Sequence, residues 1–163
     1  MAGGLGDLVA PLDPALAVVT VAVAGERAGC LVGFHSQCSI EPERYAVWLS
    51  EANRTTRLSR SAPVLAVHLL ERSQHDLAAL FGGSTGDEVD KFARCDWVPG
   101  PDGVPLLRAC PHRFVGRPVA RLAGAGDHEC VVLEPVEVGA TPAFGPLRLA
   151  AVADVEAGHP PGG

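Results

Sequence analysis

Residues 29–42 read Gly29-Cys-Leu-Val-Gly-Phe-His-Ser-Gln-Cys-Ser-Ile-Glu-Pro42 and connect two segments with the composition of β-strands. Before them, the β-branched run from Leu16 to Ala24 ends at a glycine. After them, Arg44 to Ser50 alternates between apolar and polar side chains, which is typical of a half-buried strand. We expect Cys30 to Ser39 to form one further, less regular extended segment, so this part of the chain predicts an antiparallel sheet.

A polar cluster follows directly, with the sequence Ser50-Glu-Ala-Asn-Arg-Thr-Thr-Arg57. Asn53 can cap a short helix that runs to about Arg60. Free N–H groups, the helix dipole, hydroxyls and a guanidinium together suit an anion such as phosphate. A capped helix on the surface accounts for the same residues equally well, so both interpretations stay open.

The rest of the chain predicts more strands than helices. Glycine and proline are frequent, which suits a protein of many short strands. Residues 84–112 are polar and rich in these two residues, and such a long loop suggests a function or a docking role. We expect about seven strands and two or three short helices, arranged as an antiparallel barrel with helices at its ends. The further elements are strands at Val64–Leu70, Phe114–Leu122, Glu129–Val138 and, as a last strand, Arg148–Val155, and helices at Ser73–Phe81 and near Glu88–Cys95, with flexible ends at residues 1–13 and 157–163.

Length and charge exclude several classes of protein. The chain has 163 residues, which at roughly 100–200 residues per domain predicts a single domain over 1–163. Thirteen basic and nineteen acidic side chains give a net charge of −6, which argues against a nucleic-acid-binding protein. No run of 18 apolar residues predicts a membrane span, and the start does not have the pattern of a secretory signal. The odd number of five cysteines, without a pairing pattern, predicts reduced thiols and a cytoplasmic protein.

Two patterns that suggest other chemistry lack the context they require. Gly82-Gly-Ser-Thr-Gly86 fits the nucleophile elbow of serine hydrolases, but that turn needs a strand before it and a helix after it. Here a predicted helix precedes it, so the end of a helix explains it better. The pairs His35 with Cys38 and Cys110 with His112 have no second pair at the spacing of a zinc site, so we expect no metal.

The order of these segments resembles the flavin reductase family, which has an FMN-binding split-barrel fold. The resemblance rests on the stretch Gly29–Pro42 between two strands, followed by Asn53-Arg-Thr-Thr56. It extends over roughly residues 15 to 138. Further matching motifs are Leu65-Ala-Val-His-Leu-Leu70, Gln74-His-Asp-Leu-Ala78, Asp90-Lys-Phe92, Gly103-Val-Pro-Leu-Leu107 and Gly126-Asp-His128.

The resemblance implies an NAD(P)H-dependent flavin reductase with FMN, or alternatively FAD, as flavin and NADH or NADPH as co-substrate. It also implies a homodimer and a flavin-dependent monooxygenase partner that receives the reduced flavin. His128 would lie near the nicotinamide. The flavin-binding residues that it implies are Leu31, Val32, Gly33, Phe34, Ser36, Gln37 and Cys38 around the isoalloxazine, Ser50, Asn53, Arg54, Thr55 and Thr56 around the ribityl chain and phosphate, and Lys91 and Phe92 near the flavin tail.

The sequence departs from the family pattern at the flavin stretch. Leu31, Gly33 and Phe34 replace hydroxyl-bearing residues, so backbone N–H groups must supply more of the hydrogen bonds. Two alternatives therefore remain beside the reductase. One is a flavin-binding protein with another redox role, such as an oxidase, a deazaflavin-dependent enzyme or a specialised biosynthetic enzyme. The other is a β-barrel binding module without redox activity.

Overall fold

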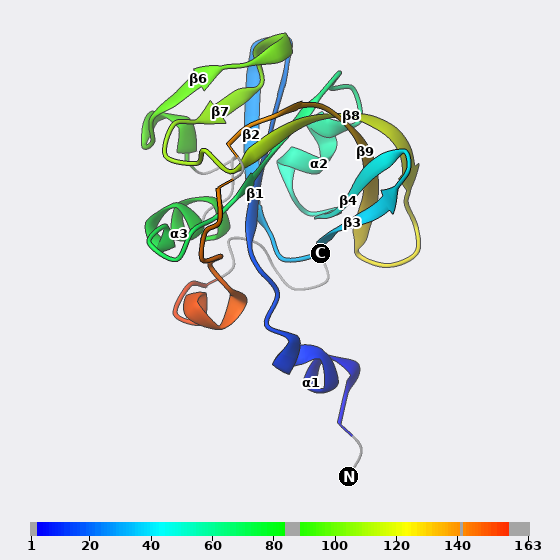
Figure 1. Cartoon of the computed structure of the whole chain (residues 1–163), viewed down its shortest axis with the longest axis vertical. Helices are drawn as coiled ribbons and strands as arrows, with labels where there is room; N and C mark the ends of the chain where they lie inside the picture. The colour runs from blue at the N-terminus through cyan, green and yellow to red at the C-terminus, as the bar shows by residue number, and fades with distance from the viewer. Residues whose placement is uncertain (1–2, 84–88, 141, 157–163) are drawn as a thin grey trace.

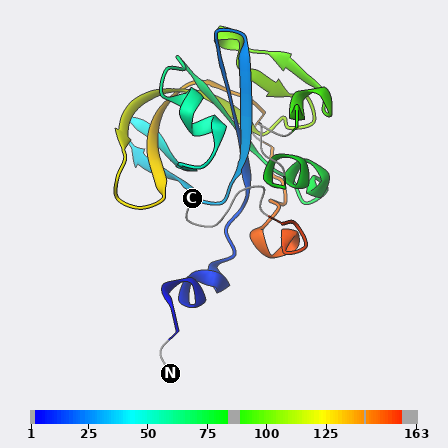
Figure 2. The same cartoon turned by 180° about the vertical axis from the view of Figure 1, so that it is seen from behind.

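A seven-stranded antiparallel sheet dominates the computed structural model, which describes residues 3–83, 89–140 and 142–156 (Figures 1 and 2). The strand order is β2-β1-β5-β8-β9-β4-β3. Two short strands form a separate hairpin beside it. The strands of the sheet are β1 (Ala17–Val23), β2 (Glu26–Val32), β3 (His35–Ile40), β4 (Glu43–Ser50), β5 (Leu65–Leu69), β8 (Arg113–Leu122) and β9 (His128–Val138), and those of the hairpin are β6 (Trp97–Pro99) and β7 (Pro105–Leu107).

The sheet curls around an apolar core but is not closed, because β2 and β3 at its two ends do not pair with each other. This is the mainly β, antiparallel split-barrel fold that the sequence predicts. Alternate residues of each strand face the barrel interior, which Val19, Val47, Leu65 and Val131 fill. The helix α2 (Arg54–Ser59) packs against β1 and β2 and contributes Leu58 to this core.

A second apolar cluster lies on the outer face of β1 and β2. There Val18 and Leu16 meet the helix α3 (His75–Gly82), the 3-10 turn η2 (Lys91–Ala93) and the C-terminal segment with η4 (Leu149–Val152). The remaining short helices are α1 (Leu5–Val9), η1 (Ala10–Leu12) and η3 (Pro101–Gly103). Figure 1 shows α1 projecting away from the sheet near the N-terminus, and none of its residues is buried.

Two predicted segments differ from the structure for a clear physical reason. The single extended segment Cys30–Ser39 is wrong, because the chain changes partner at Gly33-Phe34: β2 pairs with β1, whereas β3 pairs with β4. The strand predicted at Arg148–Val155 is also wrong. There only Arg148 forms a bridge, to Ala15, and the next residues turn into η4 because the backbone N–H of Ala150 donates to Asp13 Oδ1 at 2.8 Å.

Smaller differences concern the loops and helix starts. The hairpin of β6 and β7 lies inside the predicted long loop, where three-residue strands flanked by proline and glycine give no strand signal. The second helix begins at His75 rather than Ser73, because the Gln74 side chain accepts a hydrogen bond from the Glu71 N–H. Residues 5–12 of the predicted flexible start are helical. Ser84 to Gly86, Glu88 and residues 157–163 lie outside the described residues.

Candidate functional site

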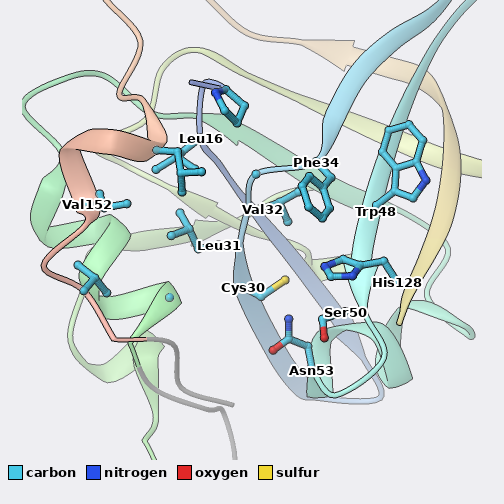
Figure 3. A pocket seen from close by; sticks show the side chains of 15 residues that line it. Leu16, Cys30, Leu31, Val32, Phe34, Trp48, Ser50, Asn53, His128 and Val152 are labelled. Atoms are coloured by element: carbon cyan, nitrogen blue, oxygen red, sulfur yellow. The ribbon is translucent and has the colours of Figure 1, made fainter. Parts of the chain in front are cut away.

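A pocket of about 350 Å³ opens between the outer edge of β2, the ends of β4 and β9, and the C-terminal segment (Figure 3). This volume lies within the range of roughly 300–1,000 Å³ that is usual for small-molecule sites. Its lining residues are Pro14, Leu16, Cys30, Leu31, Val32, Gly33, Phe34, Trp48, Ser50, Asn53, Gly82, His128, Leu149, Val152 and Val155.

One side of the pocket is an apolar wall. Figure 3 shows Leu16, Leu31 and Val152 together on this side, on three different segments of the chain. Trp48 and His128 stand on the opposite side, on neighbouring strands of the sheet. The space between the two sides therefore suits a ligand with apolar faces.

Polar groups gather at one end of the pocket. Ser50 on β4 pairs with His128 at the start of β9, so the strand register brings the two residues together. The Ser50 hydroxyl accepts a hydrogen bond from the Ala52 N–H at 3.3 Å. Asn53 stands at the N-cap of α2, but its side chain makes no capping hydrogen bond and instead lines the pocket beside Ser50.

Two rings form part of the rim of the pocket. The ring centroids of Phe34 and His128 lie 5.0 Å apart. A hydrogen bond of 2.7 Å joins His128 Nδ1 to the Asp127 carboxylate, which leaves Nε2 as the other ring nitrogen for a ligand. The Phe34 carbonyl accepts from the Trp48 N–H at 2.9 Å, so the rim is tied to β4.

The free edge of β2 adds backbone donors and acceptors. The Gly29 carbonyl accepts a hydrogen bond from Lys91 Nζ at 3.1 Å, so the Gly29 peptide groups face away from β1. Because this direction alternates along an antiparallel strand, the N–H and C=O groups of Leu31 face the same free edge, and Gly33 follows at the bend after β2. Both residues line the pocket, so this edge can hydrogen-bond a ligand without polar side chains.

The Cys30 thiol at the base of the pocket is not a nucleophile at neutral pH. Burial raises its pKa to about 11, although the hydrogen bond with Thr55 opposes this shift. A cysteine needs a lowered pKa to react as a thiolate. Cys30 therefore acts as a small apolar surface of the pocket.

The structure brings together about half of the predicted site residues. Those that line the pocket are Leu31, Val32, Gly33, Phe34, Ser50, Asn53 and His128. The others lie outside its lining: Ser36, Gln37 and Cys38 are exposed on β3, and Arg54, Thr55, Thr56, Lys91 and Phe92 have partners or burial of their own.

The contacts of that second group explain where they lie. Arg54 Nη2 donates to Glu26 Oε2 at 3.0 Å, so the guanidinium turns toward β2 rather than into the pocket. Thr56 Oγ1 donates to the Ser50 carbonyl and fixes the turn that carries the polar end. Buried Lys91 donates to the carbonyls of Gly29 and Phe81 and so ties η2 to β2 and α3.

Several residues that line the pocket were not predicted from the sequence. Trp48 had a usable signal, since it lies two residues before Ser50 in a predicted strand and therefore on the same face. Cys30 directly precedes the predicted residue Leu31, whereas the remaining ones have no local signal because they come from other parts of the chain. These are Pro14, Leu16, Gly82, Leu149, Val152 and Val155.

The structure also bears on metals and membranes. Among the described residues, no three His, Cys, Asp or Glu side chains gather closely enough to hold a metal ion. The histidines of the two His–Cys pairs noted in the sequence have other partners: His35 forms a hydrogen bond with Tyr45 Oη, and His112 forms one with the Glu71 carboxylate. The described helices include none with the length and apolar character needed to cross a membrane.

The lining residues fit a flavin. A flavin ring system is planar with apolar faces and polar edges, and the pocket offers an apolar wall, a strand edge and neutral polar groups at one end. Leu16, Leu31 and Val152 can cover a ring face, while Ser50 and Asn53 can meet polar atoms. Among the described residues that line the pocket there is no Asp or Glu, which suits an anionic ligand.

Comparisons with known proteins point the same way. The family model described as "Flavin reductase like domain" matches residues 13–150. An FMN reductase (NADH) from Stutzerimonas stutzeri is 29% identical over 132 residues, which cover 81% of this chain and 75% of that protein. The reductase subunit of a flavin-dependent monooxygenase from Mycobacterium tuberculosis is 29% identical over 122 residues, 72% of this chain but 63% of that protein. The alignment spans 37% of a probable flavin reductase from Rhizobium meliloti.

Solved structures share the fold. An FMN-binding protein from Thermus thermophilus, solved with bound 1-cyclohex-2-enone, has a TM-score of 0.75 and 25% identity over 85% of this chain and 76% of its own. The NADH:FAD oxidoreductase from Streptomyces globisporus has a TM-score of 0.77 and 22% identity over 93% of each chain. The split-barrel architecture of this chain is therefore that of known flavin-binding proteins.

Proposed function

Because the chain belongs to the family of flavin reductase like domains, we propose that it is an NADH- or NADPH-dependent flavin reductase that takes FMN, with FAD as the alternative flavin. The observation that carries this proposal is the pocket between β2, β4 and β9, which joins an apolar wall to a polar end. The lining residues of the pocket lie within the matched region, residues 13–150, except for the last two. These two are Val152 and Val155, which follow Leu149 in the C-terminal segment around η4.

A bound flavin supplies the redox chemistry by accepting a hydride from the nicotinamide, and the protein supplies binding, orientation and electrostatics. Leu16, Leu31 and Val152 exclude water from one side of the pocket. The outward peptide groups of Leu31 hold polar atoms of the ring edge, in place of the hydroxyls that the family pattern has there. This backbone edge cannot be removed by a side-chain change.

The polar end of the pocket and its rim hold the flavin chain and the nicotinamide. Ser50 and Asn53 bind the polar chain of the flavin, and Thr55 and Thr56 support them from the buried side of α2. His128, oriented by Asp127, guides the nicotinamide at the rim next to Phe34. A reaction geometry of this kind requires positioning rather than an acid or a base, because the reacting atoms must approach to about 3–3.5 Å.

We also propose two partners. The first is a flavin-dependent monooxygenase that takes up the reduced flavin, by analogy with the mycobacterial relative. The second is another copy of this chain. Leu5, Leu8 and Leu12 are each about three quarters exposed on the N-terminal helices, and burial of such side chains between two copies would remove them from water. The five free thiols fit the reducing conditions of a cytoplasm.

A flavoprotein with another electron donor is the second candidate. It is favoured by Leu31 and Phe34, which present apolar groups at the pocket, and by Phe34 in particular, which is 58% exposed at the rim and narrows the approach of a co-substrate. The two candidates differ in their response to nicotinamide.

Steady-state oxidation of NADH and of NADPH, followed at 340 nm with FMN, FAD or no flavin, separates the candidates. The reductase proposal expects turnover that depends on flavin. In the His128→Ala variant it expects a large decrease in kcat/KM for the nicotinamide, through a higher KM. Flavin binding without any nicotinamide oxidation would support the second candidate and contradict the first.

A further inference from the structure

One wall of the pocket belongs to a C-terminal strap, which we define as residues 145–156. Leu149, Val152 and Val155 of this strap line the pocket, and Figure 3 shows Val152 on the side opposite the sheet residue Trp48. Most of the opposite wall belongs to the strands β2, β4 and β9, which are held by continuous ladders of hydrogen bonds. The strap has no such ladder, so it is the wall that can move at least cost.

The first half of the strap is fixed firmly. Leu147 donates to the Leu70 carbonyl at 2.9 Å and accepts from the Leu16 N–H at 2.8 Å. The Ala150 N–H then donates to Asp13 Oδ1 at 2.8 Å. These contacts act as a hinge at the point where the strap reaches the pocket.

The second half is held more loosely. After Ala150, the polar link between the strap and the described body of the protein is one ion pair, between His75 Nε2 on α3 and Asp154 Oδ1 at 2.9 Å. Val152 and Val155 pack nearby against the cluster that contains Phe81 of α3. The hydrogen bond to Asp154 raises the pKa of His75, and the same bond lowers the pKa of Asp154, so the charged pair is favoured from both sides.

We propose that the end of this strap is the exit for the flavin, and that the His75–Asp154 pair is the latch that sets how fast the flavin enters and leaves. The proposal rests on the proposed function, since it takes the flavin as the occupant of the pocket. Neither latch residue lines the pocket, so both are positioning residues that act through Val152 and Val155. A reductase that hands its flavin to another enzyme requires such an exit.

A gate and a binding contact have different kinetic signatures. If the flavin passes only when the strap is open, a weaker latch raises the association and dissociation rates by the same factor and leaves Kd unchanged. Loss of a contact with the flavin raises the dissociation rate and Kd together. An exposed ion pair is a weak interaction, so we expect about a two- to fivefold rise in both rates.

The test is a double-mutant cycle with Asp154→Ala, His75→Ala and the double variant, in stopped-flow mixing with FMN followed by flavin fluorescence. We expect both single variants to speed association and dissociation equally, and the double variant to add nothing further. Glu156→Ala is the matched control, because it removes an exposed carboxylate of the same strap outside the pair. Leu31→Ala, which shortens a pocket wall residue outside the strap, should raise the dissociation rate and Kd but not the association rate.

Latch variants with wild-type rates, or with a changed Kd and an unchanged association rate, would overturn the proposal. Hydrogen exchange of the flavin-free protein separates this failure from a failure of the proposed function. We expect the Val155 amide, bonded to the Val152 carbonyl, to exchange faster in Asp154→Ala, while the Leu147 amide keeps its protection. If the Val155 amide exchanges as in the wild type, the latch is refuted even if FMN does not bind.

Discussion

His68 gives the sharpest prediction about the stability of the sheet behind the pocket. It is fully buried on β5, where its Nδ1 lies 3.0 Å from the Val18 carbonyl and its Nε2 accepts from the Leu107 N–H at 3.1 Å. These partners assign the proton to Nδ1 of a neutral ring. The ring therefore joins β1, β5 and the β6–β7 hairpin only while it is uncharged.

Burial lowers the pKa of His68 to about 4, whereas an unfolded histidine has a pKa of about 6.5. Between these values the unfolded chain binds a proton that the folded chain does not. The stabilisation is therefore complete above about pH 6.5, decreases as the pH falls and is constant below about pH 4. The difference of about 2.5 pKa units corresponds to about 3 kcal/mol of unfolding free energy.

The variant His68→Leu removes both the titration and the two hydrogen bonds. At pH 7.5 it should be less stable than the wild type by about 2–6 kcal/mol, because a buried carbonyl and a buried N–H lose their partners at about 1–3 kcal/mol each. Urea unfolding at pH 7.5 and pH 4.5 measures the gap in unfolding free energy between the wild type and the variant at each pH. The gap should narrow by about 2–3 kcal/mol at the lower pH. A gap that is the same at both pH values would refute the neutral, hydrogen-bonded role of His68.

Three further predictions concern the site and its supports. Asn53→Ala should weaken FMN binding about tenfold in a fluorescence titration, since one hydrogen bond is lost, while an unchanged Kd would remove Asn53 from the site. Glu129→Gln should lower the unfolding free energy by about 3 kcal/mol in urea, because buried Glu129 bonds Arg60 at 2.9 Å and Arg121 at 2.7 Å. Burial alone would raise the pKa of Glu129, but the two guanidinium groups lower it overall, so this stabilisation is lost as the pH falls through the lowered pKa; equal stability of the two proteins at pH 7 would contradict it. At pH 8 a thiol reagent should modify exposed Cys38 quickly and leave Cys30 and Cys110 intact, because burial raises the pKa of these two to about 11 and about 12; rapid loss of all five thiols would show that the core opens.

The strands that could be predicted are those with a clear period. β1, β4, β5, β8 and β9 appear as β-branched or alternating runs because one face of each packs into the barrel. The break at Gly33-Phe34 could not be found locally, since it depends on β2 and β3 having different partners. The strap was mistaken for a strand because Leu147 and Leu149 alternate with Arg148, while the contact with Asp13 that turns the chain lies more than 130 residues away in the sequence.

The candidate site could be predicted where it is continuous in sequence. Leu31 to Phe34 form one stretch, and Ser50 and Asn53 lie at the end of the next strand, so a resemblance over one segment located both. Leu16 and Val152 could not be located, because their place in the wall depends on packing between the two ends of the chain. Lys91 shows the opposite case: its motif matched, but its ammonium donates to the carbonyls of Gly29 and Phe81 and it does not line the pocket, so a role at the flavin stays a prediction.

The central claim is that flavin-dependent oxidation of NADH or NADPH takes place in this pocket. The variant Gly33→Leu tests it, because a Cβ at Gly33 would lie 3.7 Å from Leu16 Cδ2, an ordinary contact, so the added side chain takes up space in the pocket without strain at its base. The measurement is oxidation at 340 nm with added FMN, made on wild type and variant with equal unfolding midpoints. We predict flavin-dependent turnover by the wild type and at least a tenfold loss of kcat/KM for FMN in the variant. Equal turnover by both proteins, or no turnover by the wild type, would contradict the account.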